Sequence, residues 1–274
     1  MQHFNIKTNR EVKVIECSAL TKAGFIAGFS TRLGGISPLP ENALNLALFS
    51  GDTQENVEEN RERFLSALKL NVATDQNYEI ITAKQVHSAD SSLVTSLSKA
   101  QQTPMTCDAL LTNEKNILLG IQTADCLPVL VADPKNQAIV GIHAGWRGTL
   151  ARIVEKSLEQ LVKNFGSNPS DCLAATGPAI GQCCFEVGSE VKEAFEAEFS
   201  SYGSNLFNNH QPNGKSHMDL RLANQEQLLS CGLKSDNIFV WNDCTLCRMD
   251  LYFSYRGEIS RGAVGRLLSV IGLA

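Results

Sequence analysis

Hydrophobic residues occur along the chain in short runs that predict several β-strands. Runs that are rich in β-branched, aliphatic and aromatic residues and are bounded by turn-forming residues are typical of strands with buried faces. These runs predict strands over Gly24–Ser30, Tyr78–Val86, Ile117–Thr123, Leu127–Ala132, Gln137–His143 and Ile238–Trp241. Strands are thus expected in the first, middle and last parts of the chain.

Helices are predicted between these strands, where apolar residues recur at helical spacing. From Thr149 to Phe165 the apolar residues form one stripe, and Gly166 is well placed to end the helix. Asp52 and Glu55 have the spacing of a capping box at the start of a helix over 52–70. Further helices are predicted over Glu190–Phe199 and Leu220–Ser230. Because strands and helices do not alternate strictly, we predict an α+β fold with mixed α/β layers.

Length and composition favour one layered domain. The chain has 274 residues, of which 43% are hydrophobic, enough to build one large core. No repeat and no Pro-, Gly- or Ser-rich linker divides it, and Ser91–Thr106 is expected to be a polar surface loop. We therefore expect a single domain over residues 1–274.

Charge and patterning exclude several classes of partner. The net charge of −5 and the scattered Lys and Arg residues argue against nucleic-acid binding. The apolar runs are shorter than the roughly 20 residues of a membrane span, and charges interrupt the N-terminal segment where a signal peptide would lie. The nine cysteines are odd in number and are interpreted as mostly reduced thiols. We expect a cytoplasmic protein without a membrane partner, acting as a monomer.

The segment Leu127–His143 is interpreted as a β-hairpin with Asp133-Pro-Lys-Asn136 as its turn. If Ala132 pairs with Gln137, the same register places Cys126 directly opposite His143. Directly opposed residues share a face, with Cβ atoms about 4.5 to 5.5 Å apart. A thiolate and an imidazole at that separation can bind one metal ion.

A third ligand is expected from His87, which ends the predicted strand over 78–86. Two imidazoles and one thiolate are the usual ligand count of a catalytic zinc site, and the fourth position stays open for water or substrate. A blue-copper centre has the same three ligands but needs a weak axial ligand, usually Met. Five histidines are too few for a multicopper oxidase. Zinc is therefore preferred to copper.

Three loops have the residues expected for anion binding. His143-Ala-Gly-Trp-Arg-Gly148 leads into the predicted helix, with Gly145 and Gly148 allowing close backbone approach and Arg147 available for bidentate contact. Ser30-Thr-Arg32 precedes paired glycines, and Gly177–Glu186 combines turn residues with two thiols and an acid. The alternative is that Arg147 forms a structural ion pair.

Four further cysteines are interpreted as structural. Cys183 and Cys184 are adjacent, a spacing that rarely closes a disulfide, and are expected to line a turn. Cys244 and Cys247 form a C-x-x-C motif, which is found in thioredoxin-like and zinc sites, but the motif lacks a partner pair and does not open a helix of a βαβ unit. No chemistry is assigned to these four thiols.

Together these motifs resemble the YfiH-like family, also called laccase-domain or polyphenol oxidase proteins and peptidoglycan editing factors. The resemblance rests on Ser30-Thr-Arg-Leu-Gly-Gly-Ile-Ser37, Asn45-Leu with Gly51-Asp52, Gln85-Val-His87, Asp108-Ala-Leu-Leu-Thr112, Thr123-Ala-Asp-Cys-Leu-Pro128, His143-Ala-Gly-Trp-Arg-Gly148, Gly177-Pro-Ala-Ile-Gly-Gln-Cys-Cys184 and Phe253-Ser-Tyr-Arg256. It implies a layered sandwich domain of the YfiH-like type, with His87, Cys126 and His143 as metal ligands.

The resemblance also implies purine nucleoside phosphorylase activity on adenosine, inosine and methylthioadenosine, with adenosine deamination beside it. In this interpretation the substrates are a purine nucleoside and phosphate. Arg32, Asn45, Arg147, Gly145 and Gly148 are the substrate- or phosphate-binding candidates. Asp125 and Glu186 are candidate general acids or bases, and Arg32 is counted with Asp125 as catalytic.

Two other activities remain open from the sequence. Cys126 and His143 also suit a cysteine hydrolase or amidase, with the thiol as nucleophile acting on a peptidoglycan precursor. A copper polyphenol oxidase is the less favoured alternative. Metal content separates them, because a nucleophilic thiol must be free.

Overall fold

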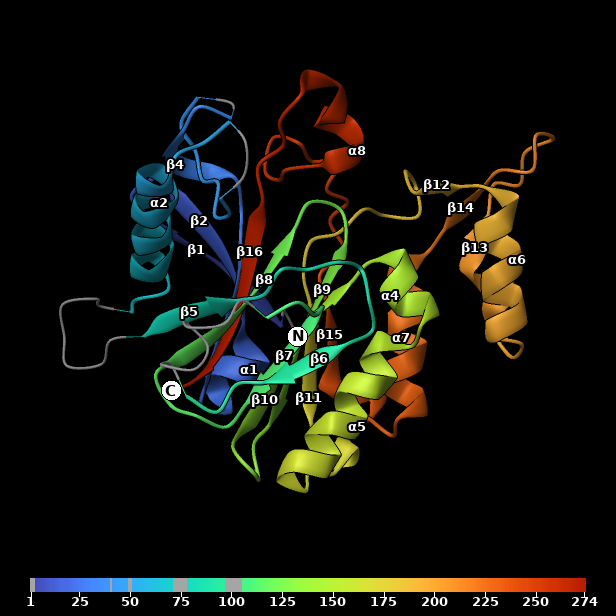
Figure 1. The fold of residues 1–274 in the computed structure, drawn as a ribbon, viewed down its shortest axis with the longest axis horizontal. Helices are drawn as coiled ribbons and strands as arrows, with labels where there is room; N and C mark the ends of the chain where they lie inside the picture. Colours follow the sequence, from blue (N-terminus) through green and yellow to red (C-terminus); the bar gives the residue numbers. More distant parts are fainter. Residues whose placement is uncertain (1–2, 40, 49–50, 71–77, 97–104) are drawn as a thin grey trace.

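The computed structural model describes residues 3–39, 41–48, 51–70, 78–96 and 105–274. Two six-stranded sheets lie face to face, and helices cover their outer surfaces (Figure 1). In the first sheet the order is β1 (Phe4–Asn9), β2 (Val12–Cys17), β3 (Phe25–Ser30), β16 (Leu267–Leu273), β8 (Ile117–Thr123) and β5 (Glu79–Thr82). In the second it is β15 (Ile238–Val240), β11 (Leu173–Thr176), β9 (Leu127–Asp133), β10 (Ala138–Ala144), β7 (Ala109–Thr112) and β6 (Ser91–Leu93). The expected α+β sandwich class is confirmed.

Smaller elements surround the two sheets. A three-stranded sheet has the order β12 (Glu186–Val187), β14 (Ser216–Met218) and β13 (Phe207–Asn208), and β4 (Leu33–Ser37) lies near the N-terminal strands. The helices are α1 (Ser18–Lys22), α2 (Gln54–Ala67), α4 (Trp146–Leu150), α5 (Ile153–Phe165), α6 (Ser189–Glu198), α7 (Leu220–Ser230) and α8 (Tyr255–Glu258). Within the described ranges, no helix has the length and apolar character needed to cross a bilayer.

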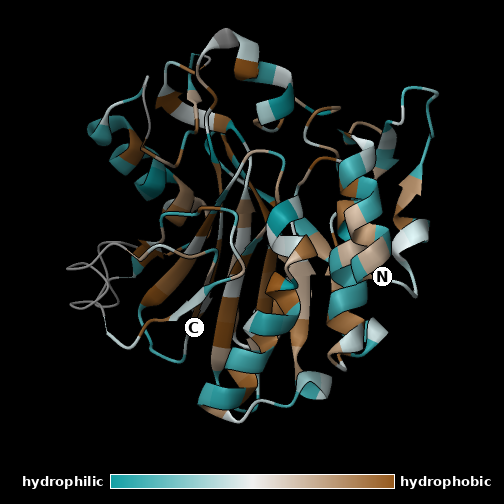
Figure 2. Ribbon diagram, turned by 45° about the vertical axis from the view of Figure 1, so that its right-hand side comes forward, coloured by the Kyte–Doolittle hydropathy of each residue, from teal (hydrophilic) through white to brown (hydrophobic). Residues whose placement is uncertain are grey.

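Three hydrophobic cores hold these layers together. One lies between the sheets, one between the second sheet and α5 with α7, and one between the first sheet and α2. In β9, Val129 and Val131 face the helices, while Leu130 and Ala132 face the other sheet. Figure 2 accordingly shows the strands at the centre as the most hydrophobic part of the molecule. A strand buried on both faces appears in the sequence as a continuous apolar run.

The helix predictions hold in position but differ at two ends. α7 coincides with the predicted segment, and Gly166 ends α5 in the left-handed conformation, as expected. The continuous helix from Thr149 is wrong, because Arg152 adopts a left-handed conformation (φ 62°) and separates α4 from α5. The predicted capping box of Asp52 and Glu55 is wrong, because the N-cap of α2 is Thr53, whose side chain accepts a hydrogen bond from the backbone N–H of Asn56.

The hairpin exists, but its predicted register is wrong by two positions. Asp133 pairs with Ala138, and His143 pairs with Pro128. The connection is longer than expected because the Asp133 carboxylate accepts hydrogen bonds from the backbone N–H groups of Lys135 and Asn136, which fold residues 134–137 into the loop. A two-residue shift preserves the face of every side chain. Cys126 and His143 therefore still lie on the same face, as diagonal neighbours.

Two predicted boundaries also change. The strand from Tyr78 is limited to β5, so the residues up to Val86 form a connection. The predicted polar loop Ser91–Thr106 begins with β6, and its residues 97–104 lie outside the described residues.

Two connections between the sheets position the functional residues. The chain passes from β8 to β9 through Ala124, Asp125 and Cys126, and from β5 to β6 through a segment that contains His87. Both connections lead from the first sheet to the second. Their side chains meet those of β10 at one end of the sandwich.

Candidate metal centre

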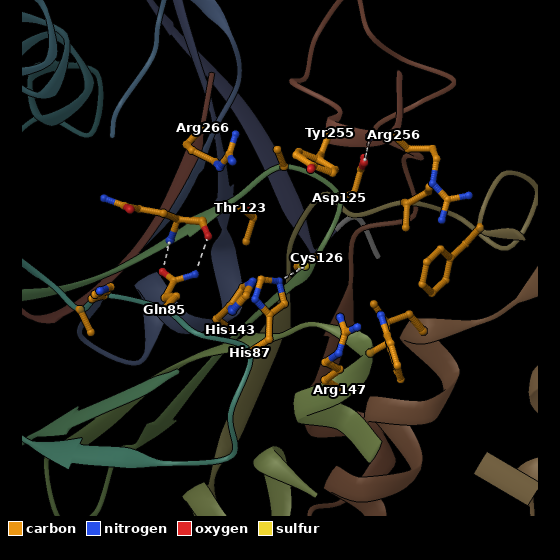
Figure 3. A pocket seen from close by; sticks show the side chains of 18 of the residues that line it. Gln85, His87, Thr123, Asp125, Cys126, His143, Arg147, Tyr255, Arg256 and Arg266 are labelled. Carbon is orange, nitrogen blue, oxygen red and sulfur yellow. Dashed lines mark hydrogen bonds between the residues drawn. The ribbon is translucent and has the colours of Figure 1, made fainter. Parts of the chain in front are cut away.

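His87, Cys126 and His143 converge at the end of the intersheet layer (Figure 3). Their potential ligand atoms all lie within 4.8 Å of one another. Cys126 Sγ is 3.7 Å from His87 Nε2, and the two imidazole rings are 4.9 Å apart in an edge-to-face arrangement. Residues from both crossover connections and from β10 thus form one possible three-ligand metal site.

The carboxylate of Asp108 holds two of these side chains in place. Its Oδ1 is 2.8 Å from His143 Nδ1, which directs Nε2 toward Cys126. The same carboxylate accepts hydrogen bonds from the backbone N–H groups of Val86, His87 and Ser88, at 3.2, 2.9 and 2.7 Å. A carboxylate behind a ligating histidine fixes the ring orientation and the tautomer. Asp108 therefore positions both imidazoles.

Gln85 joins the two crossover connections. Its amide oxygen accepts a hydrogen bond from the backbone N–H of Gln122 at 2.9 Å, and its amide nitrogen donates to the carbonyl of Gln122 at 2.7 Å (Figure 3). The side chain thereby extends the pairing of β5 with β8 beyond the last strand residues. This contact sets the distance between the segments that carry His87 and Cys126.

The backbone around the three side chains is closely fitted. A Cβ atom on Gly145 would lie 2.9 Å from Cδ2 of His87 and 3.1 Å from Sγ of Cys126. His87 and Asp125 both have positive φ, 61° and 89°. Non-glycine residues adopt this conformation only where surrounding contacts enforce it. Local strain and the absence of a side chain at Gly145 together allow the ligand atoms to meet.

The protonation equilibria of the metal-free cluster favour an ion pair. Burial raises the pKa of Cys126, but the His143 charge and hydrogen bonds from both imidazoles outweigh it and lower this pKa to about 6. Burial lowers the pKa of His143, but the Cys126 charge and the Asp108 hydrogen bond raise it to about 9. Burial raises the pKa of Asp108, and the hydrogen bonds from His143 and Ser88 lower it to about 2. At neutral pH the metal-free site holds a thiolate beside an imidazolium.

The three side chains open into a cavity of about 760 Å³. This volume is in the range of small-molecule sites. Its lining residues combine aromatic, basic and polar groups: Leu48, Ala83, Lys84, Gln85, His87, Gln122, Thr123, Ala124, Asp125, Cys126, His143, Trp146, Arg147, Ile180, Phe185, Leu220, Tyr255, Arg256 and Arg266. Figure 3 places Arg147 on one side of the cluster and Arg266 and Tyr255 on the other.

Comparison with known proteins decides the family. The model of the family described as multi-copper polyphenol oxidoreductase laccase matches residues 26–274. The chain belongs to this laccase family. Over its full length it superposes on the crystal structure of a Bacillus licheniformis protein titled hypothetical protein YfiH, with a TM-score of 0.87, 30% identity and 100% coverage of both chains. The resemblance to YfiH-like proteins is thus confirmed.

Relatives of this laccase-family chain have enzyme names. A purine nucleoside phosphorylase of Bacteroides thetaiotaomicron is 34% identical over 273 residues, which cover 97% of this chain and 98% of the relative. An adenosine deaminase named RL5, from an unknown prokaryotic organism, is 32% identical and covers 89% of this chain and 94% of its own length. These similarities support an enzyme of this family.

Of the predicted anion-binding residues, Arg147 lines the cavity of the laccase-family chain. The side chain of Arg147 is exposed, and its guanidinium lies 4.2 Å from the centre of the Trp146 ring. Among the described residues it has no ion-pair partner, which argues against the structural alternative. Gly148 packs so closely that a Cβ there would be 2.8 Å from the carbonyl oxygen of Ser88. Gly145 and Gly148 therefore shape the site through close approach.

Arg32 and Asn45 lie outside the cavity lining, contrary to expectation. Arg32 is buried and donates hydrogen bonds to the carbonyls of Met249 and Tyr252, and its ion pair with Glu258 is 3.0 Å long. Asn45 is fully buried, and its amide oxygen accepts a hydrogen bond from the backbone N–H of Arg266 at 2.9 Å. A buried guanidinium that is already bound by carbonyls and a carboxylate is unsuited to phosphate. Both residues support the structure around the cavity.

The two candidate acid–base residues also separate. Asp125 lines the cavity, and its carboxylate accepts hydrogen bonds from Thr245 Oγ1 at 2.6 Å and from the backbone N–H of Arg256 at 2.7 Å. Glu186 lies on β12, outside the lining, and pairs with Lys215 at 2.6 Å. The structure therefore brings Asp125, and not Glu186, to the cavity.

Sequence reasoning assigned no role to Asp108, Gln85, Tyr255, Arg256 or Arg266. A charged residue directly before the apolar run 109–111 was the available signal for Asp108, since a buried carboxylate needs partners. The motif Phe253-Ser-Tyr-Arg256 was the available signal for Tyr255 and Arg256, whereas Arg266 is in none of the quoted motifs.

Proposed function

We propose that the chain is a zinc-dependent purine nucleoside phosphorylase that acts on adenosine, inosine and methylthioadenosine and also deaminates adenosine. The observation that carries this proposal is the cavity itself, in which three clustered ligands adjoin basic and aromatic side chains. The names of the relatives supply the reaction class. The cavity contains side chains suited to each part of that reaction, namely metal binding, phosphate binding, purine binding and proton transfer.

His87, Cys126 and His143 would hold the zinc ion. The set fits a metal because the three ligand atoms are mutually close, and because Gly145 leaves the space that a Cβ would fill. Three protein ligands are typical of a catalytic zinc site. When bound, the ion would act as a Lewis acid and lower the pKa of water in its open position.

Zinc is preferred to copper on two structural grounds. Described clusters that could hold a metal contain no histidine other than His87 and His143. Methionine, the usual axial ligand of blue copper, is missing from the described cavity lining. The described residues therefore offer neither the axial methionine of a blue-copper centre nor the additional histidines of a multicopper site.

The basic side chains suit the phosphate substrate. In phosphorolysis, a phosphate oxygen forms a bond to C1′ of the ribose while the bond from C1′ to the purine nitrogen breaks, and the departing purine takes up a proton. Arg147 can contact the phosphate because its guanidinium is exposed and has no carboxylate partner among the described residues. Positioning and charge neutralisation are the main contributions a protein makes to such a displacement.

Aromatic side chains and one acid complete the proposed assignments. Trp146, Phe185 and Tyr255 line the cavity and offer apolar surfaces for a purine. Asp125 is the one carboxylate among the described lining residues, so it is the proposed group for proton transfer. In deamination, water adds at C6 of the purine and ammonia leaves. This reaction also requires proton transfer, for which Asp125 is again the proposed group.

A cysteine hydrolase is the second candidate, favoured by one observation. In the metal-free cluster the pKa of Cys126 is lowered to about 6 by His143 and His87 against the effect of burial, as in activated nucleophilic thiols. Such an enzyme would act on an amide, for example in a peptidoglycan precursor. Bound zinc would occupy the thiolate and abolish this activity.

The first test measures metal content and adenosine turnover on protein purified without chelator. We expect zinc in the protein and release of adenine that requires phosphate. Chelation should abolish the release, and added zinc should restore it. Adenosine turnover that persists without metal would contradict the proposal, and amide hydrolysis by the metal-free protein would support the second candidate.

A variant pair tests the phosphate assignment. Arg147→Gln should raise the KM for phosphate by about tenfold, the equivalent of one lost charged hydrogen bond, with a smaller change for adenosine. The control is Arg248→Gln, which removes an arginine that pairs with Asp250 outside the cavity lining. An equal increase in both KM values would point instead to general damage of the site.

A further inference from the structure

The structure contains a second cluster of possible metal ligands, to which the proposed reaction assigns no role. It consists of Cys183, Cys184, Cys244 and Cys247. The first two lie in the connection between β11 and β12, and the last two follow β15. Their sulfur atoms all lie within 4.8 Å of one another. The adjacent pair and the C-x-x-C motif, which are more than 60 residues apart, are therefore partners.

The spacing of the sulfurs suits a shared metal ion. Cys247 Sγ lies 3.4 Å from Cys184 Sγ and 3.6 Å from Cys183 Sγ. In a tetrahedral site with Zn–S bonds of about 2.3 Å, neighbouring sulfurs are about 3.8 Å apart. A disulfide would bring two of them to about 2.05 Å, and all four cysteines are free thiols.

The backbone is built around these sulfurs. Ala179 and Cys244 form a parallel bridge, and the backbone N–H of Thr245 donates to the carbonyl of Ala179. At Gly181 a Cβ would lie 3.1 Å from Cys183 Sγ and 3.1 Å from Cys244 Cβ, so the loop passes close to both cysteines. The Gly181 N–H also donates to Cys244 Sγ at 3.1 Å. N–H groups directed at a sulfur stabilise its thiolate form.

A buried cation lies beside the cluster. Arg221 is 8% exposed and donates hydrogen bonds to the carbonyls of Ala179 and Asp243, which flank the cysteine segments. Its Nε is buried without a hydrogen-bond partner among the described residues. Burial lowers the pKa of Arg221, whereas negative charge on Asp219, and then on Cys244 and Cys183, raises it. The guanidinium is therefore within electrostatic range of the sulfurs.

We propose that these four cysteines bind one zinc ion as a closed structural site. Four thiols lose four protons to the solvent as Zn²⁺ binds, which leaves the site with a charge of −2 that Arg221 partly offsets. Four thiolates without other ligands select zinc over magnesium or calcium, and four protein ligands leave no open position for substrate.

The ion would stabilise one side of the large cavity. Ile180 and Phe185, which line the cavity, flank the segment that contains Cys183 and Cys184. On the other side, Thr245 follows Cys244 and donates a hydrogen bond to Asp125. Binding one ion to both segments fixes these residues relative to each other.

The test uses cobalt as a spectroscopic probe and zinc as the native ion. His143→Ala protein, which lacks one ligand of the three-residue centre, is titrated with Co²⁺ under anaerobic conditions. We expect about one cobalt per chain, with thiolate-to-cobalt charge transfer and the intense visible bands of a tetrahedral site. Zinc should displace the cobalt, and X-ray absorption of the zinc form should give four sulfur neighbours at about 2.3 Å.

Two variants locate the site in the sequence. Cys247→Ser in the same background should abolish the charge-transfer band or weaken cobalt binding at least tenfold. The control Cys231→Ser should leave both unchanged, because Cys231 lies at the end of α7, outside the cluster. If His143→Ala protein does not fold, zinc content alone decides: about two ions per chain in the unmodified protein and about one in Cys247→Ser.

Two results would overturn the proposal. One is folded His143→Ala protein that shows no thiolate-to-cobalt band while its cysteines react as free thiols. The other is a disulfide between members of the cluster in protein kept under reducing conditions. Neither result depends on purine turnover, so this site and the proposed activity can fail separately.

Discussion

The two cysteine-containing clusters differ in ligand number and in surroundings. His87, Cys126 and His143 lie where two intersheet connections meet, and their potential metal site opens into the large cavity. The second cluster has four thiols on two surface loops and no comparable opening among the described lining residues. A three-ligand site leaves room for chemistry, whereas a four-ligand site serves stability. If both proposals hold, zinc would serve catalysis at the first cluster and stability at the second.

The largest effect is expected for His143→Ala, which removes one of the three proposed metal ligands. We expect this variant to lose the metal of the three-residue centre and at least about a hundredfold in kcat/KM for adenosine, because ligand loss exceeds the effect of removing an outer-shell partner. Metal analysis and a coupled assay for adenine measure both effects. His217→Ala is the control, since His217 on β14 lies outside both clusters. Full activity in His143→Ala would show that the three-residue centre is not catalytic.

Asp108→Asn should have the next largest effect. The amide keeps the size of the side chain but removes the charge that orients His143, so we expect metal affinity to fall by about 10- to 100-fold. Competition with a chromophoric chelator measures this affinity. In the control Asp90→Asn, an exposed side chain changes while the Asp90 carbonyl still accepts its two backbone hydrogen bonds. Equal losses in both variants would show that Asp108 acts through folding.

Thiol alkylation in metal-free protein should distinguish the two clusters by pH. The pKa of Cys126 is lowered to about 6, so its reactive thiolate is present above this pH and falls about tenfold per unit below it. In contrast, burial and neighbouring thiols raise the pKa of Cys183 to about 11. Peptide mass spectrometry after iodoacetamide treatment should give a midpoint near pH 6 for Cys126 and slow reaction of Cys183 at neutral pH. Identical pH profiles of alkylation for Cys126 and Cys183 would contradict the difference between their pKa values.

The smallest expected effect on catalysis comes from Cys247→Ser. Loss of a structural ion should lower the melting temperature by roughly 5 °C, equivalent to one or two kcal/mol in a domain of this size. The kcat for adenosine should change by less than about threefold. Differential scanning fluorimetry and initial rates, compared with Cys231→Ser, measure the two quantities. A loss of kcat as large as that of His143→Ala would mean that the second cluster takes part in the reaction.

The sequence predicted the three-residue centre better than the four-cysteine cluster for a physical reason. Cys126 and His143 are joined by a single hairpin, and a register error of two positions leaves them on the same face. The link between Cys184 and Cys247 depends on how two distant loops are placed by β11 and β15. No local periodicity encodes that placement.

The same distinction explains the other outcomes. Strands such as β8 and helix α7 were predicted because burial produces a local pattern. Arg152, at the break between α4 and α5, pairs with the distant Glu198 as well as with the neighbouring Glu155, and the buried Arg32 pairs with the distant Glu258. Partners so far away in the sequence leave no local pattern. Arg32 precedes paired glycines like an anion-binding arginine, but its partners come from the C-terminal part of the chain.

The intersheet crossovers have a consequence for folding. His87 and Cys126 are on connections that leave the first sheet, whereas His143 belongs to the second, so the three ligand atoms meet only after the sheets have docked. Long-range contacts of this kind form late, after loop closure has been paid for in entropy. A metal that binds only the docked state stabilises it by mass action, by about 2.7 kcal/mol at a concentration a hundredfold above Kd. If the proposed ion binds there, the folded fraction of the chain would rise with the concentration of free metal.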